Sequence, residues 1–196
     1  MIYSIVHFIF SILFKILFRF EVIGKENIPK EGPVVIASNH ASLFDPPLLG
    51  TAANRPVHFM AKEELFVPVL GSIYKTLGAF PVKRGASDIG ALKHALVLLS
   101  KDKVVGIFPE GTRTKTGKLG PAGPGTCMIA SRGKATIVPT AIIGSALKRN
   151  KSLWPKIKVV FGKPIPYREN ISINKENLHE MTEEMMSKIA ELLEQN

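Results

Sequence analysis

Cysteine is nearly absent from this chain of 196 residues, which contains only Cys127. A single cysteine excludes an internal disulfide and makes a structural zinc site improbable. The five histidines show no pair at the spacing of metal ligands. The scarcity of cysteine fits a reducing compartment. We therefore expect neither a bound metal ion nor a resident cofactor.

Acidic residues are also scarce. The chain has 16 Asp and Glu but 26 Lys and Arg, which gives a formal net charge of +10. Hydrophobic residues nevertheless make up 45% of the chain. A basic, apolar chain suggests an anionic partner, either a membrane or a nucleic acid. Nucleic-acid binding would need aromatic side chains interleaved with a basic face, whereas phenylalanine occurs here in apolar runs. We therefore predict a membrane surface with anionic lipid as partner and no nucleic acid.

No uncharged apolar run reaches the roughly 20 residues that span a bilayer. Residues 2–20 come nearest, but Lys15 interrupts them. Their polar residues form one narrow stripe on a helix, since the spacings are three or four; they are Ser4, His7, Ser11, Lys15 and Arg19. A secretory signal is not expected, because a basic start and a small-residue cleavage site are lacking.

We interpret residues 1–20 as a membrane-associating helical segment that lies in the interface, with its polar stripe toward the headgroups. This predicts a peripheral or monotopic protein on the cytoplasmic face of the cell membrane. A spanning anchor and a core helix of a soluble protein remain as alternatives.

Residues 21–196 read as one α/β domain whose largely parallel, mixed sheet is flanked by helices, because predicted strands alternate with helices. The expected strands are Val34–Ser38, Val57–Ala61, Ala79–Val82, Val104–Phe108, Thr136–Ile143 and Ile157–Phe161. The expected helices are Pro47–Asn54, Gly71–Leu77, one capped by Ser87 and running to Ser100, Gly125–Ser131 and Asn174–Glu194. Sites in such sheets form beyond the carboxyl ends of the strands.

A histidine and a carboxylate follow the first of these strands, in the segment Asn39-His-Ala-Ser-Leu-Phe-Asp45. Histidine titrates near neutral pH and can take a proton from a hydroxyl. A carboxylate on its other ring nitrogen would fix the tautomer. Residues five apart do not share a helix face, so His40 and Asp45 meet only if the chain turns between them. Because the residue before a proline is pushed out of the helical region, Asp45 should lie outside any helix. The alternative to its pairing with His40 is that Asp45 simply caps the N-terminus of the following helix.

Charged side chains follow other strands at what should be the same edge of the sheet. Glu110, Gly111, Thr112 and Arg113 form a turn after Phe108, in which the glycine permits the tight bend. Arginine suits bidentate recognition of phosphate. The alternative is a surface turn in which Glu110 pairs with Arg113. Two further cation sets follow strands, namely Lys62 and the pair Lys83 and Arg84.

Together these segments resemble the motif blocks of the glycerolipid acyltransferase family, in particular its lysophosphatidic acid acyltransferases. NHASLFD matches the H-x-x-x-x-D block, and FPEGTR matches the E-G-T-R block. KEELFVPVLG, GAFPVKRG and ATIVPTAI match the remaining blocks, in order. The stretch Pro121 to Gly125 departs from the pattern.

The resemblance implies transfer of a fatty acyl group from a thioester to the sn-2 hydroxyl of lysophosphatidic acid. It implies catalytic roles for His40 and Asp45. It implies substrate binding by Lys62, Lys83, Arg84, Glu110, Gly111, Thr112 and Arg113. The donor, a co-substrate, would be an acyl thioester of acyl carrier protein or of coenzyme A. Another acceptor, such as glycerol 3-phosphate or another lysolipid, and a non-catalytic basic membrane-binding domain are the alternatives.

A second basic cluster follows the predicted strand Thr136–Ile143 and surrounds Trp154. Its members are Lys148, Arg149, Lys151, Lys156 and Lys158. We expect it to contact the membrane surface or an acidic carrier protein, with a solvated loop as the alternative. Acyl carrier protein is therefore a further candidate partner.

Overall fold

The computed structural model describes residues 2–76, 78–82, 88–114, 116, 118–147, 152–169 and 171–196, without the side chains of residues 2–4, 69, 70, 73 and 76. Lys83, Arg84 and Ser87 therefore lie outside the described residues, as do Lys148, Arg149 and Lys151 of the second basic cluster.

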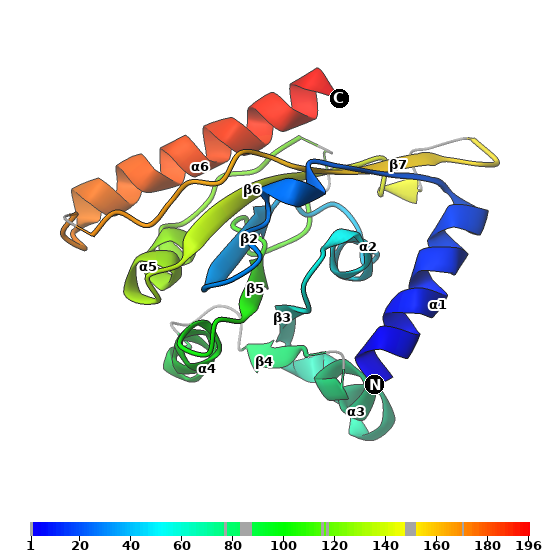
Figure 1. Ribbon diagram of the computed structural model, residues 1–196, viewed down its shortest axis with the longest axis horizontal. Helices are drawn as coiled ribbons and strands as arrows, with labels where there is room; N and C mark the ends of the chain where they lie inside the picture. The colour runs from blue at the N-terminus through cyan, green and yellow to red at the C-terminus, as the bar shows by residue number, and fades with distance from the viewer. Residues whose placement is uncertain are drawn as a thin grey trace.

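A seven-stranded sheet forms the centre of the molecule, in the order β1-β7-β6-β2-β5-β3-β4 (Figure 1). The strands are β1 (Arg19–Ile23), β2 (Val34–Ser38), β3 (Val57–Lys62), β4 (Phe80–Val82), β5 (Val104–Ile107), β6 (Thr136–Ile143) and β7 (Lys156–Phe161). All pairs are parallel except β6 with β7. The predicted mixed, largely parallel α/β sheet is confirmed.

The central strand β2 is buried on both faces, which explains why its sequence is an unbroken apolar run. Successive side chains of a strand point to opposite faces. Val34 and Ile36 accordingly belong to one hydrophobic cluster, and Val35 and Ala37 to the other. The sheet therefore has a core on each side.

Helices cover both faces of the sheet (Figure 1). The helices are α1 (Ile2–Leu17), α2 (Asp45–Ala52), α3 (Pro68–Thr76), α4 (Ile89–Leu99), α5 (Gly125–Arg132) and α6 (Lys175–Gln195), with 3₁₀ turns at Lys25–Asn27 and Glu63–Leu65. The core that contains Val34 includes residues of α1 and α2, and the core that contains Val35 includes residues of α4, α5 and α6. The long C-terminal helix packs mainly on β6.

Two predicted helix starts differ from the structure. Helix α2 begins at Asp45 and not at Pro47, so the prediction that Asp45 lies outside any helix was wrong. Proline is tolerated in the first turn of a helix, where its missing N–H would be unpaired, so Pro46 does not delay this start. Helix α4 is capped by Asp88 and not by Ser87, since the Asp88 side chain accepts from the Ala91 N–H.

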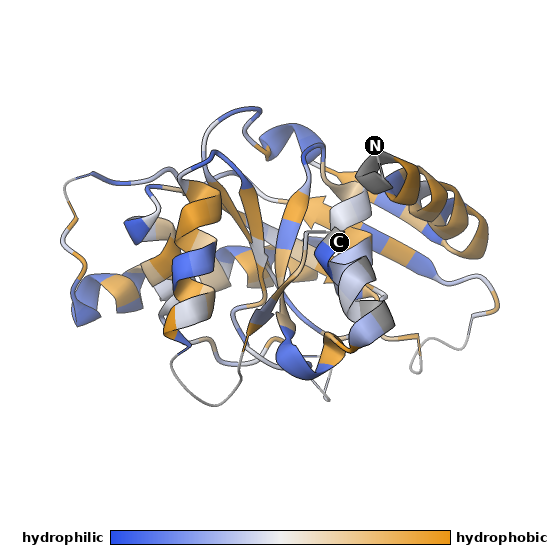
Figure 2. Ribbon diagram, turned by 90° about the horizontal axis from the view of Figure 1, so that it is seen from below, coloured by the Kyte–Doolittle hydropathy of each residue, from blue (hydrophilic) through white to orange (hydrophobic). Residues whose placement is uncertain are grey.

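Helix α1 is apolar on two sides that have different surroundings. Phe14 of α1 is buried in the same core as residues of α2, as is Phe18, which directly follows the helix. A row of large apolar side chains on the other side is exposed, comprising Ile5, Phe8, Ile9, Ile12, Leu13, Ile16 and Leu17. Figure 2 shows this mostly hydrophobic helix at the rim of the molecule. No helix in the described part of the chain is long and apolar enough to cross a membrane.

Part of the segment of residues 1–20 belongs to the packed domain. Phe14 of α1 and Phe18, which follows the helix, enter the protein core, and the first strand of the sheet begins at Arg19. Part of the polar stripe faces the domain, because His7, Ser11 and Lys15 line a cavity between α1 and the rest of the fold.

Candidate active site

The predicted site residues follow strands that run in the same direction. Strands β2, β5, β3 and β4 are parallel neighbours in that order. His40 follows β2, Glu110 follows β5, and Lys62 ends β3. The carboxyl ends of parallel strands meet at one edge of a sheet, where sites in α/β folds form.

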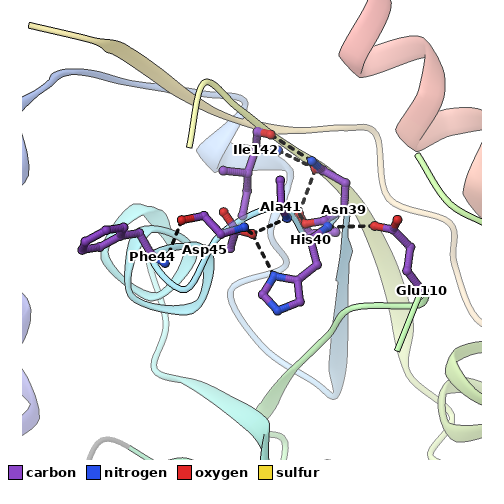
Figure 3. Close-up of polar contacts among 9 residues, drawn as sticks. Asn39, His40, Ala41, Phe44, Asp45, Glu110 and Ile142 are labelled. Carbon is purple, nitrogen blue, oxygen red and sulfur yellow. Dashed lines mark hydrogen bonds and ion pairs between the residues drawn. The ribbon is translucent and has the colours of Figure 1, made fainter. Parts of the chain in front are cut away.

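His40 and Asp45 are in direct contact, as the motif predicted (Figure 3). The distance between His40 Nδ1 and Asp45 Oδ2 is 2.8 Å. Asp45 is fully buried, and the His40 side chain is 9% exposed. Asp45 Oδ2 already accepts hydrogen bonds from two backbone N–H groups, so it acts as an acceptor and Nδ1 carries the ring proton. In the neutral ring the other nitrogen, Nε2, then carries no proton and can act as a base.

The turn between the two residues is held by Asp45 itself. The backbone N–H groups of Ala41 and Ser42 donate to Asp45 Oδ2 at 2.7 Å each. The carboxylate thus points back along the chain and does not cap α2, whose N-cap residue is Phe44. The position of Asp45 in the first turn also places its negative charge at the positive end of the helix dipole. The alternative N-cap role for Asp45 is therefore not what the structure shows.

Glu110 joins the loop after β5 to the histidine. Its Oε1 accepts from the His40 N–H at 2.8 Å (Figure 3). Its Oε2 accepts from the Gly120 N–H at 2.7 Å. The Thr114 N–H donates to the His40 carbonyl at 2.8 Å. Both backbone groups of His40 are therefore fixed by the 110–120 segment. The alternative pairing of Glu110 with Arg113 is not present among the described residues.

Two residues that sequence reasoning missed hold His40 from other sides. Asn39 exchanges two hydrogen bonds with the backbone of Ile142 in β6. The Phe108 ring stacks on the His40 imidazole with centroids 4.1 Å apart. The position of Asn39 directly before His40 could have indicated its role in the sequence. Nothing in the sequence indicated that the Gly120 N–H would donate to Glu110.

The remaining predicted binding residues are more exposed. Gly111 has a φ of 66°, the left-handed conformation that a tight turn requires. Thr112 and Arg113 are exposed beside this turn. Lys62 forms an ion pair with Glu64 at 2.8 Å, on the surface. Lys83 and Arg84 were predicted here and lie outside the described residues.

Cys127 is not placed to react. It is fully buried in α5, and burial raises the pKa of its thiol. A thiol with a raised pKa supplies little of the nucleophilic thiolate. Within the described ranges, no group of three His, Cys, Asp or Glu side chains could hold a metal ion.

A histidine ring held by a buried carboxylate, at the carboxyl edge of an α/β sheet, is the arrangement that general-base enzymes use. The family model described as Acyltransferase matches residues 19–143 of this chain. The chain belongs to this acyltransferase family, and the predicted resemblance is confirmed.

Known relatives agree with this assignment. The chain is 36% identical over 175 residues to the 1-acyl-sn-glycerol-3-phosphate acyltransferase of Bacillus subtilis (strain 168), covering 88% of this chain and 87% of the relative. It is 35% identical over 132 residues to the chloroplastic 1-acyl-sn-glycerol-3-phosphate acyltransferase BAT2 of Brassica napus, covering 65% of this chain and 38% of that relative.

A solved structure shares the fold. It is the 1-acyl-sn-glycerophosphate (LPA) acyltransferase PlsC from Thermotoga maritima, which is 25% identical in sequence. The TM-score is 0.75, with 97% of this chain and 79% of that chain covered. The expected fold class is thus also seen in a solved protein.

Proposed function

We propose that this protein transfers a fatty acyl group from an acyl thioester to the sn-2 hydroxyl of 1-acyl-glycerol 3-phosphate, giving phosphatidic acid. The observation that carries the proposal is the His40–Asp45 pair, held at the carboxyl edge of the sheet. The names of the relatives from Bacillus subtilis and Thermotoga maritima support the same acceptor.

In the proposed mechanism, His40 Nε2 takes the proton of the acceptor hydroxyl as the hydroxyl oxygen attacks the thioester carbonyl. The new ester bond forms as the thiolate leaves, and the imidazolium returns its proton to that thiolate. Asp45 orients the ring and stabilises the imidazolium. The acyl group passes directly to the acceptor, since the buried Cys127 offers no nucleophile for an acyl-enzyme.

The acceptor phosphate is assigned to Arg113 and Lys62, with Lys83 and Arg84 as further candidates. Arg113 is exposed in the turn after β5 and forms no ion pair with a described residue. Lys62 lies at the end of β3, where its ion pair with Glu64 is exposed. An exposed ion pair is worth about 0–1 kcal/mol, so an arriving phosphate can displace it. Gly111 and Thr112 would line the same turn.

An acceptor panel tests the activity. Purified protein is given 1-acyl-glycerol 3-phosphate, glycerol 3-phosphate and a lysolipid without a phosphate monoester. Each is paired with acyl carrier protein and coenzyme A thioesters as donors. We expect thioester consumption to depend on 1-acyl-glycerol 3-phosphate. Preference for another acceptor would replace the substrate assignment, and no acceptor-dependent consumption would refute the activity.

The phosphate role of Arg113 has a matched control in Arg132. Arg132 is also exposed, but it ends α5 shortly before β6 begins, toward the amino edge of the sheet. Arg113→Ala should raise the KM for 1-acyl-glycerol 3-phosphate about tenfold or more, because a charged hydrogen bond contributes about 1.5–3 kcal/mol. Arg132→Ala should leave the KM unchanged. An unchanged KM for Arg113→Ala would contradict the assignment.

We also propose that the protein is peripheral or monotopic on the cytoplasmic face of the membrane, bound through α1. The exposed side of α1 is apolar along its length. A helix with such a face lies in the interface with its apolar side chains among the acyl chains. This placement keeps the site close to lipid substrates.

Substitutions on the exposed side of α1 test this binding without disturbing Phe14 or Phe18. Phe8, Ile12 and Ile16 changed together to serine should abolish flotation of the protein with lipid vesicles. The control changes Ile89 and Val97, which are exposed apolar residues of α4. Equal flotation of both variants would refute the role of α1.

A further inference from the structure

A cavity of about 310 Å³ lies between α1 and the rest of the fold, away from the candidate active site. The polar stripe of α1 supplies His7, Ser11 and Lys15, while Lys25 and Thr51 close it from the domain side. The volume is at the lower end of the range of small-ligand sites. The cavity is thus large enough for a headgroup.

The cavity carries positive charge and no negative charge. Two of its lining residues are lysines, and none is acidic. Neither Lys15 nor Lys25 forms an ion pair with a carboxylate in the described part of the chain. Thr51 is only 8% exposed, and its hydroxyl has no hydrogen-bond partner among the residues that the structure describes. Unpaired cations around an available hydroxyl suit an anion with several acceptor oxygens.

The local fold holds Lys25 at this position. Gly24 follows β1 with a φ of 70°, and the 3₁₀ turn starts at the next residue, Lys25. A side chain at Gly24 would meet the Phe161 carbonyl oxygen of β7. The left-handed glycine therefore lets the chain turn tightly against β7 and present Lys25 to the cavity.

The cavity is separate from the catalytic pair. Thr51 lies six residues after Asp45 in α2, which places it about 9 Å farther along the helix axis. Asp45, which contacts His40, begins α2, and the cavity is at the end of this helix. The cavity therefore does not serve as the acceptor site of the acyl transfer.

The exposed apolar side of α1 indicates the source of the anion. Ser11 and Lys15 point about 100° away from Ile12 and Ile16 around the helix, given 3.6 residues per turn. If the apolar side rests among acyl chains, the cavity lies at the depth of lipid phosphates. A free anion would not need this neighbouring apolar surface.

We propose that this cavity, lined by Lys15, Lys25 and Thr51, binds the phosphate of an anionic glycerophospholipid of the bilayer. Both ammonium groups contact the phosphate oxygens, and the Thr51 hydroxyl donates to one of them. This inference rests on the membrane-association part of the proposed function. The site would fix the orientation of the domain on the bilayer.

Vesicle flotation tests the site with two variants and a charge-matched control. The vesicles are pure phosphatidylcholine, or phosphatidylcholine with a minority of phosphatidylglycerol. Lys15→Ala with Lys25→Ala removes both cations, and Thr51→Val removes only the hydroxyl. The control, Lys93→Ala with Lys101→Ala, removes two exposed lysines from α4 and the turn after it, on the other face of the sheet.

The double variant should bind anionic vesicles about 30-fold more weakly, since each lysine near an anionic bilayer contributes a factor of about five. Thr51→Val should weaken binding at least about fivefold, because a hydrogen bond to a charged group is lost. The control should stay within about twofold, because distant surface charges are screened. Circular dichroism melting confirms that each variant is folded.

Four outcomes would overturn the proposal. Wild-type affinity of a folded Thr51→Val variant would show that the lysines attract the bilayer without a built site. Wild-type flotation of a double variant that binds inorganic phosphate more weakly than the wild-type protein does would assign the cavity to a free anion. If the wild-type protein binds no vesicle, membrane association itself is refuted. If the wild-type protein binds normally and both variants bind equally well, only the phosphate site is refuted.

Discussion

Asn39 and Ile142 exchange two hydrogen bonds at the end of the central strand. Asn39 Nδ2 donates to the Ile142 carbonyl at 2.9 Å, and the Ile142 N–H donates to Asn39 Oδ1 at 2.8 Å. Asn39 is buried and directly precedes His40. The Asn39 amide thus ties the start of the turn that carries His40 to the neighbouring strand β6.

Asn39→Ala should therefore reduce both stability and turnover. The buried N–H and carbonyl of Ile142 would both lose their hydrogen-bond partner. Each unsatisfied group lowers the free energy of unfolding by about 1–3 kcal/mol. Urea unfolding measures the free energy, and steady-state kinetics measures kcat. Asn39→Asp keeps the acceptor and loses the donor, so it should also be impaired. Normal kcat in a folded Asn39→Ala variant would show that this tie does not position His40.

Glu110→Gln separates a positioning role from substrate binding. Both oxygens of Glu110 accept backbone N–H groups, whereas glutamine offers one acceptor and sets an NH₂ group against a donor. We expect kcat to fall with little change in the KM for the acceptor, together with a stability loss of about 1–3 kcal/mol. A raised KM with unchanged kcat would instead return Glu110 to the substrate-binding role that the sequence suggested.

Cys127→Ala should retain nearly full turnover. The thiol is fully buried, and its pKa is raised by burial, so the native protein should also resist alkylation by iodoacetamide. Activity is measured before and after treatment with the reagent, and mass spectrometry looks for an adduct. An acyl group trapped on Cys127 would contradict direct transfer.

His58 should make stability depend on pH. Burial lowers the pKa of His58, which lies near the Gly78 carbonyl with Nδ1 at 3.0 Å. The unfolded chain therefore binds more protons than the folded one near pH 6, and stability rises with pH there. The contribution is complete above the unfolded pKa and is lost as pH falls through the folded pKa. His58→Gln should flatten this part of the unfolding free-energy profile, and an unchanged slope would contradict it.

Periodicity and strand ends predicted the parallel sheet and the pairing of His40 with Asp45. Buried strands leave apolar runs in the sequence, and the carboxyl ends of parallel strands share one edge. The first turn of α2 was not predictable in this way, because Asp45 accepts from residues that precede it. The separation of Glu110 and Gly120 by ten residues likewise leaves no local pattern.

The orientation of α1 was also beyond sequence reasoning. Its stripe of polar residues is compatible with headgroups or with a cavity, because periodicity describes one helix and not its neighbours. The structure decides through Phe14 and Phe18, which pack in the core and turn Ser11 toward the domain.

The turnover of His40→Ala tests the central claim most directly. The assay follows thioester consumption dependent on 1-acyl-glycerol 3-phosphate, with His179→Ala as control, since His179 is an exposed histidine of α6. Removal of a positioned general base should lower kcat at least about 100-fold, while the control stays at the wild-type rate and both variants remain folded. Near wild-type turnover of folded His40→Ala would contradict the account.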